Sequence, residues 1–227
     1  MKVNAVIIVT APQGNEGALS AFDFVAEFCT QKHNSISVFF YQDGVRQDYS
    51  TWHALQKKYN IKLHTCVAAA RRRNIDSDNI NLSGIGALVT ACSATDVKMV
   101  GFNPHPPFRH PHSKLENGSS KYLIILHNHP NNNFLAAEAL DIALGIAALE
   151  QKVSLLFSGT GTLQLLIPDS LKILAALNLY DINNIYVTDI SLKNNNLHYK
   201  KLKLQPQVIT SEQVTALELD NDIILSF

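Results

Sequence analysis

The sequence has no excess of charge of either sign. Its 227 residues include 19 Lys and Arg against 19 Asp and Glu, so the formal net charge is zero. Proteins that bind nucleic acid mainly through phosphates carry a strong basic excess, because each phosphate contact needs a cation. The charge balance therefore argues against a dedicated nucleic-acid-binding protein.

Long apolar runs and paired cysteines are also missing. No uninterrupted apolar stretch approaches the ~18–20 residues that cross a bilayer. The short apolar run Ala5–Val9 passes directly into the turn-like segment Thr10–Gly14, so we expect a strand there and no signal peptide. Three cysteines, an odd number, do not make a disulfide framework. These absences favour a soluble cytoplasmic protein with no membrane-spanning segment.

Several catalytic and nucleotide-binding motifs are absent as well. The sequence contains no Gly-Lys-Ser/Thr, which excludes a P-loop. Ser158–Gln164 follows a predicted strand but lacks the third glycine of a dinucleotide fingerprint, and Leu82–Gly86 precedes a helix without closing a strand. No Gly-x-Ser-x-Gly elbow occurs, which counts against a serine hydrolase. We therefore expect no nucleotide cofactor.

Apolar segments that alternate with amphipathic ones dominate what is present. Continuous apolar runs such as Ala5–Val9, Ile36–Tyr41 and Ile61–Cys66 are separated by stretches with apolar residues three or four apart. Strands that are apolar throughout and alternate with helices indicate a parallel sheet covered on both faces. The expected fold class is α/β, with two tandem Rossmann-like domains, each a mostly parallel sheet flanked by helices.

The same order of segments occurs twice. Residues 1–102 and 121–227 each make a unit of about 100 residues, a normal domain size. Residues 103–120 between them are rich in Pro, His and Ser, which predicts an extended linker. His105, His110 and His112 lie in this segment, but no cysteine or acidic cluster stands near them, so a solvated linker is favoured over a metal site.

A second pair of histidines follows a predicted strand. His127 and His129 lie two residues apart at the end of Tyr122–Leu126, where α/β proteins place ligands. No third ligand is evident for a metal. A polar turn or interface contact is therefore favoured over a catalytic or metal-binding pair.

Two of the three cysteines are interpreted as core residues. Cys29 continues the apolar residues Leu19, Phe22 and Ala26 of the first predicted helix, and Cys92 continues a similar stripe in the helix around Ile85–Cys92. Buried cysteine of this kind packs as a small apolar residue.

Cys66 is placed differently. It ends the predicted strand Ile61–Cys66 and precedes a helix that runs into Arg71, Arg72 and Arg73. Amide groups at that helix start, with help from nearby guanidinium groups, would favour the nucleophilic thiolate, although the arginines could instead point into solvent. The residues leave two interpretations open, a reactive thiol and a buried strand cysteine.

Segments in both halves carry a resemblance to one family. Ser37–Val45, Cys66–Arg73 and Leu82–Leu88 are similar to the TusD subunit of the DsrE family of sulfur relay proteins. In the second half, the segments that resemble the TusC subunit are Gly161–Leu166, Leu177–Ile182 and Asp222–Phe227. The chain therefore looks like a TusD–TusC fusion.

The resemblance implies a sulfurtransferase that works in the 2-thiolation of the wobble uridine of certain tRNAs. The family's sulfur-carrying cysteine falls on Cys66, and the relay needs neither metal nor cofactor. The implied partners are a TusA-like sulfur donor, a TusE-like acceptor and a TusB-like subunit, with the fused chain dimerising in a hexamer-like assembly and never touching the tRNA itself. The second half has no cysteine, so a structural or docking role is expected for it.

The first half departs from the family pattern at two places. It looks shortened between Val45 and Trp52 and again between Asn74 and Asn81, which puts the presentation of Cys66 and the usual donor and acceptor in question. Two alternative functions also remain at this point: a DsrE/DsrF-type carrier of dissimilatory sulfur oxidation, and a non-catalytic assembly scaffold with a buried Cys66.

Overall fold

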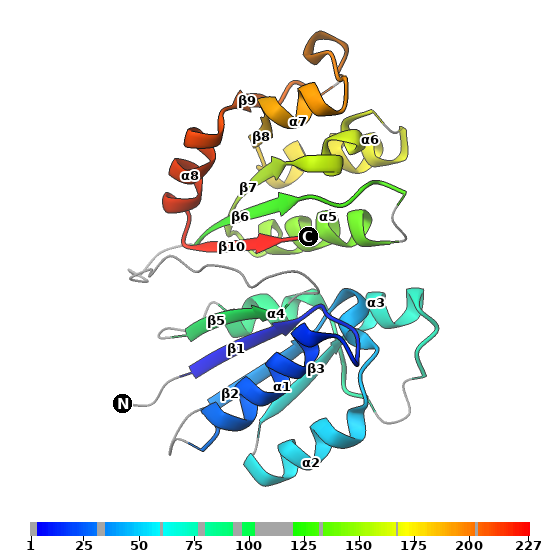
Figure 1. Cartoon of the computed structure of the whole chain (residues 1–227), viewed down its shortest axis with the longest axis vertical. Coiled ribbons are helices and arrows are strands. Elements are labelled where there is room, and N and C mark those ends of the chain that lie inside the picture. Colours follow the sequence, from blue (N-terminus) through cyan, green and yellow to red (C-terminus); the bar gives the residue numbers. More distant parts are fainter. Residues whose placement is uncertain are drawn as a thin grey trace. The chain divides into compact units, whose positions relative to one another are not determined.

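The computed structural model describes residues 4–30, 35–59, 61–76, 80–92, 97–102, 120–131, 134–166, 168–202 and 204–227. The chain divides into two compact units, Met1–Arg109 and His110–Phe227, which are described separately as unit 1 and unit 2 (Figure 1). The expected linker lies, apart from Ser120, outside the described residues, and so do His105, His110 and His112.

Unit 1 alternates strands with helices along the chain. Its strands are β1 (Asn4–Val9), β2 (Ser35–Phe40), β3 (Lys62–Cys66), β4 (Leu82–Ser83) and β5 (Val97–Phe102). Its helices are α1 (Glu16–Phe28), the short 3-10 helix η1 (Gln42–Val45), α2 (Tyr49–Tyr59), α3 (Val67–Arg72) and α4 (Ile85–Cys92).

The strands of unit 1 form one sheet in the order β4-β3-β2-β1-β5, and every described strand pair is parallel. The chain builds the sheet outward from β1 to β4 and then returns through α4 to β5 on the other side of β1. Because parallel crossovers are right-handed, this reversal puts α1 and α4 on opposite faces, as Figure 1 shows. Both faces of the sheet are therefore covered, which explains why its central strands are apolar throughout.

Unit 2 repeats this plan. Its strands are β6 (Lys121–Leu126), β7 (Lys152–Phe157), β8 (Asn184–Thr188), β9 (Gln207–Ile209) and β10 (Ile223–Ser226). Its helical segments are α5 (Leu135–Ala147), η2 (Gly159–Leu165), α6 (Pro168–Ala175), η3 (Leu177–Tyr180), α7 (Asp189–Asn194), η4 (Tyr199–Lys201) and α8 (Ser211–Leu219).

The sheet of unit 2 has the same topology as that of unit 1. Its order is β10-β6-β7-β8-β9, again with parallel pairs in the described residues. Read from the opposite edge, each strand takes the place of its counterpart in unit 1: β6 that of β1, β7 that of β2, β8 that of β3, β9 that of β4 and β10 that of β5. The expected fold class, two mostly parallel α/β sheets flanked by helices, is confirmed.

The buried face of α1 differs from the expected one. Ala18, Ala21 and Val25 are buried, whereas Leu19 is 59% exposed. Small side chains let a helix approach a sheet closely, and the larger Phe22 instead packs at the side, with its ring centroid 5.1 Å from that of Trp52. Cys29 is accordingly half-buried just beyond the helix, not a core residue.

The helix expected over Ser170–Leu179 is also interrupted. It consists of α6, which ends at Ala175, and the separate 3-10 turn η3, which begins at Leu177. Leu177 is fully buried, whereas Leu179 is largely exposed. The turn lets the chain place Leu177 in the core before β8 begins at Asn184.

Candidate functional site

Cys66 is the last residue of β3 and the residue before α3. Its backbone is extended (φ −61°, ψ 116°), and its side chain is 1% exposed. The thiol therefore lies where the sequence placed it, at the carboxyl end of a parallel strand and the start of a helix. It is not at the reversal of the sheet, which falls between β1 and β5, two strands away.

The arginines after Cys66 do not all take the expected role. Arg73 is buried, with a side chain only 3% exposed, and its Nε donates to Oδ1 of Asp43 at 2.8 Å. Its Nη1 donates to the carbonyl of Ala69 at 3.2 Å. Arg71 is exposed. Arg73 thus ties the end of α3 to η1, and its charge is held by a carboxylate.

Unit 2 carries Thr188 at the position equivalent to Cys66, the last residue of β8 before α7. The Thr188 hydroxyl donates to Oγ of Ser191 at 2.6 Å, and the amide of Gly159 donates to the same oxygen at 2.8 Å. In unit 1 the position of Ser191 is taken by Ala69. The two hydroxyl side chains of Thr188 and Ser191 therefore correspond in unit 1 to the thiol of Cys66 and the methyl group of Ala69.

Two further polar residues lie near the carboxyl end of β3. The Nδ1 of His64 is 3.0 Å from Oγ of Ser83, and Ser83 is the register partner of Cys66 on β4. Burial and, to a lesser extent, the charge of Lys62 lower the pKa of His64. Sequence analysis did not identify His64 or Ser83, although the spacing of His64, two residues before Cys66 on a strand, puts both on one face.

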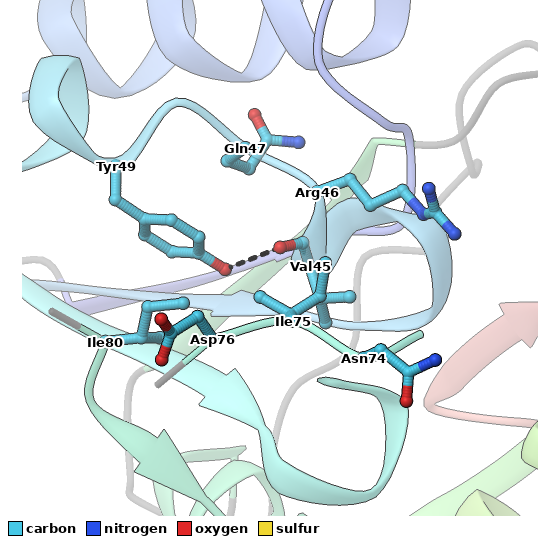
Figure 2. Close-up of a pocket in the computed structure, with 8 residues that line it drawn as sticks. All are labelled: Val45, Arg46, Gln47, Tyr49, Asn74, Ile75, Asp76 and Ile80. Atoms are coloured by element: carbon cyan, nitrogen blue, oxygen red, sulfur yellow. Dashed lines mark hydrogen bonds between the residues drawn. The ribbon is translucent and has the colours of Figure 1, made fainter. Parts of the chain in front are cut away.

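A pocket of about 370 Å³ opens beside β3. Its walls are the connector after η1 and the connector after α3, and Figure 2 shows the eight lining residues: Val45, Arg46, Gln47, Tyr49, Asn74, Ile75, Asp76 and Ile80. The lining residues of these connectors fall in or next to the two segments that were expected to be shortened, between Val45 and Trp52 and between Asn74 and Asn81. The hydroxyl of Tyr49 donates to the carbonyl of Val45 at 2.9 Å and lies 3.1 Å from Oγ1 of Thr65, the residue before Cys66.

Of the remaining residues considered in the sequence, the two histidines after β6 lie in a turn, and the two other cysteines lie at or near helix ends. The Nδ1 of His129 accepts from the amide of Asn131 at 3.0 Å, and the carbonyl of His127 accepts from Thr160 at 2.9 Å, as in a polar turn. Burial raises the pKa of the Cys29 thiol. Cys92 ends α4, and its side chain lies outside the described residues.

Within the described ranges, no group of three or more His, Cys, Asp and Glu side chains is arranged to hold a metal ion. No helix in the same part of the chain is both long and apolar enough to span a membrane.

Comparisons with known proteins identify a family profile and several named relatives that the chain resembles. The sequence profile of the DsrE/DsrF-like family matches residues 120–227. A protein of Sodalis glossinidius called sulfurtransferase TusD is 31% identical over 125 residues, which cover 42% of this chain and 96% of that protein. A sulfurtransferase TusD homolog of Vibrio parahaemolyticus is 38% identical over 79 residues, covering 29% of this chain and 60% of its own length.

Among solved structures, the ychN protein from E. coli matches 48% of this chain and 99% of its own length, with a TM-score of 0.44 and 14% identity. From the profile and the relatives together, the chain belongs to the DsrE/DsrF-like family.

Proposed function

We propose that the chain is a sulfurtransferase that accepts a sulfur atom on Cys66 as a persulfide and passes it to an acceptor thiol. Relatives named sulfurtransferase TusD support this activity. The observation that carries the proposal is the pair of equivalent strand ends. One strand ends in Cys66, the other ends in Thr188, whose hydroxyl donates to Ser191, and unit 2 has no cysteine at all.

The reaction is an exchange between thiols and a sulfane sulfur. The Cys66 thiolate attacks the outer sulfur of a donor persulfide, R–S–SH, forming Cys66–S–SH and releasing the donor thiolate. An acceptor thiolate then attacks the outer sulfur of Cys66–S–SH, takes that atom and regenerates the Cys66 thiolate. Each step breaks one S–S bond and forms one, so no external oxidant or reductant is consumed.

The burial of Cys66 adds a requirement. A thiol that is 1% exposed reacts only when the segments that cover it open, and such openings involve the least stable parts of a structure. The segments around η1 and α3 are the candidates, because they pack on each other and on β3. Sulfur transfer would then depend on a local opening that a donor or acceptor protein promotes.

The pathway and partners belong to the same proposal. The transferred sulfur serves 2-thiolation of the tRNA wobble uridine in the cytoplasm, with a TusA-like donor and a TusE-like acceptor. The chain combines a TusD-like unit 1 with a TusC-like unit 2, which docks a TusB-like subunit, and two fused chains form a hexamer-like assembly. The repeated sheet topology supports a fusion of two related units.

A transfer assay tests the proposal. The full chain is incubated with a cysteine desulfurase, radiolabelled cysteine and a TusA-like donor, and protein-bound label is measured before and after reduction. We expect label on the wild type that a reductant removes, and background label on Cys66→Ser. Cys29→Ser, which removes a half-buried thiol of the same unit, is the matched control and should accept label like the wild type. Equal labelling of Cys66→Ser and wild type would refute the assignment.

The burial of Cys66 favours a second candidate, a non-catalytic assembly scaffold in which this thiol only packs. Alkylation by iodoacetamide distinguishes the two. A reaction at Cys66 in the folded protein that a TusA-like donor accelerates supports the carrier, whereas no reaction without denaturant, even with the donor present, supports the scaffold.

A further inference from the structure

Three chemistry-bearing residues share one face at the carboxyl end of the unit 1 sheet. His64 and Cys66 are two residues apart on β3, and alternate residues of a strand point to the same side. Ser83 on β4 is the register partner of Cys66 in a parallel pair, so its side chain lies on that side too. The hydroxyl of Ser83 therefore stands beside Cys66 and within hydrogen-bond distance of His64.

The imidazole of His64 is held by both neighbouring strands. Its Nδ1 lies 3.0 Å from the Ser83 hydroxyl of β4, and its ring stacks on Phe39 of β2 with ring centroids 6.4 Å apart. Phe39 and Ser83, which contact it from these strands, carry no formal charge, and the charge of Lys62 on its own strand acts on it. Because burial and Lys62 lower the pKa of His64, the ring is neutral near pH 7 and its Nδ1 can accept the Ser83 proton.

Unit 2 replaces all three residues together. Thr188 takes the place of Cys66, Tyr186 that of His64, and Ile209, the register partner of Thr188, that of Ser83. There Ile209 belongs to the apolar core, with Tyr186 and the α8 residues Val214 and Leu217 packed against it. Unit 2 thus fills the positions of Ser83 and His64 with side chains that pack in an apolar cluster, whereas unit 1 has a hydroxyl and an imidazole on the face that carries its thiol.

We propose that His64 is a positioning residue that acts on Cys66 through Ser83. This inference rests on the proposed function and deepens it. The Cys66 thiol gives its proton to Oγ of Ser83 while the Ser83 hydroxyl proton passes to Nδ1 of His64, leaving a Cys66 thiolate and an imidazolium. After the thiolate has taken the outer sulfur of R–S–SH, the proton returns by the same route to the leaving thiolate. The sum is Cys66–SH plus R–S–SH giving Cys66–S–SH plus R–SH.

The test measures the rate at which iodoacetamide alkylates Cys66 between about pH 5 and pH 9, in the full chain with Cys29 and Cys92 changed to alanine. We expect His64→Asn and Ser83→Ala each to slow alkylation at pH 7 about tenfold, by raising the midpoint of the profile about one pH unit. The double variant should react no more slowly than the slower single variant, because the two residues act through one another. Ser83→Thr, which keeps the hydroxyl, should restore the rate.

Controls distinguish loss of the proposed proton transfer through Ser83 to His64 from loss of the folded structure. His198→Asn, at an exposed histidine of unit 2, should leave the profile unchanged. Circular dichroism checks the fold of each variant, and His64→Gln replaces His64→Asn if the latter does not fold. A folded His64 variant with the wild-type profile would overturn the relay, and so would independent, additive effects of the two residues.

The same variants are also assayed for transfer of labelled sulfur. If wild type takes no label on Cys66, the proposed function fails, whatever the alkylation profiles show. If wild type takes label and the His64 variants match it in both label and profile, the relay alone fails. The two outcomes are therefore distinguishable.

Discussion

At the scale of single residues, two glycines stand where the chain passes close to a carbonyl. A Cβ atom on Gly44 would overlap the carbonyl of Val9, and one on Gly161 would overlap the carbonyl of Leu126. Both glycines lie in the 3-10 turn after the second strand of their unit. Gly161 lies in the segment Ser158–Gln164, which lacks the third glycine of a dinucleotide fingerprint, and the close backbone contact explains why a glycine stands there.

The close approach of Gly44 to the carbonyl of Val9 predicts that a larger residue at position 44 lowers stability. Gly44→Ala should lower the free energy of unfolding of unit 1 by about 2–3 kcal/mol, because the backbone must shift to admit the methyl group. Gly86→Ala is the control, since nothing lies within 4 Å of its Cβ and alanine favours a helix by up to about 1 kcal/mol. Urea unfolding followed by the fluorescence of Trp52, the sole tryptophan, reports on unit 1. Equal losses in the two variants would contradict this explanation.

A half-buried tyrosine makes the stability of unit 1 depend on alkaline pH. Burial raises the pKa of Tyr49 from 10 to about 12, although the hydrogen bond to Thr65 opposes the shift. A raised pKa means that the folded state favours the protonated phenol. The stabilisation is complete below pH 10 and is lost as the pH rises through about 12.

Tyr49→Phe should therefore show a weaker fall in the free energy of unfolding over that range than the wild type. The measurement is urea unfolding by Trp52 fluorescence at several alkaline pH values. An identical slope in both proteins would show that Tyr49 is not the group responsible.

At the scale of elements, each unit uses the side chain that follows one helix, α3 or α7, to join that helix to a 3-10 turn: a charged residue, Arg73, in unit 1 and an amide, Asn195, in unit 2. In unit 1, Arg73 joins the end of α3 to η1 through Asp43 and the carbonyl of Ala69. In unit 2, Nδ2 of Asn195 donates to the carbonyls of Gly159 and Ser191 and to Oγ1 of Thr162. Ser191 is the counterpart of Ala69, so the two side chains hold equivalent backbone positions.

Because Asn195 occupies the position of Arg73 in unit 2, two variants of Arg73 test this hydrogen-bonded connection. Arg73→Ala should lower the free energy of unfolding by about 1.5–3 kcal/mol, the range for hydrogen bonds to charged groups. Arg73→Asn, which reproduces the residue of unit 2, should lose less, because the amide can still reach the carbonyls. Trp52 fluorescence during urea unfolding measures both. The interpretation fails if asparagine is no better than alanine at this position.

The elements also show what patterning can and cannot predict. Apolar runs gave the central strands to within a residue, because a strand buried on both faces has few polar positions. The buried face of α1 was predicted wrongly, since hydrophobicity alone favours Leu19 over the alanines that the close helix–sheet contact needs. The two-residue strand β4, which brings Ser83 to Cys66, has no periodicity to detect.

At the scale of the whole molecule, two copies of one topology have diverged in chemistry. The sequence predicted the repeat and the strand end that carries Cys66, because both follow from local patterns. It did not predict which strands are neighbours, and the proximity of His64 and Ser83 to Cys66 depends on the register of β3 and β4. The local hydrophobic pattern was enough to place Cys66 at a strand end. The residues around it, His64 and Ser83, come together only through the pairing of β3 with β4.

The most direct test of the central claim is peptide mass spectrometry of the full chain after incubation with a persulfide donor. We expect the peptide containing Cys66 to gain the mass of one sulfur atom that a reductant removes, and the peptides containing Cys29 and Cys92 to stay unmodified. A sulfur atom found on Cys29 or Cys92 with Cys66 unmodified would show that Cys66 is not the sulfur carrier.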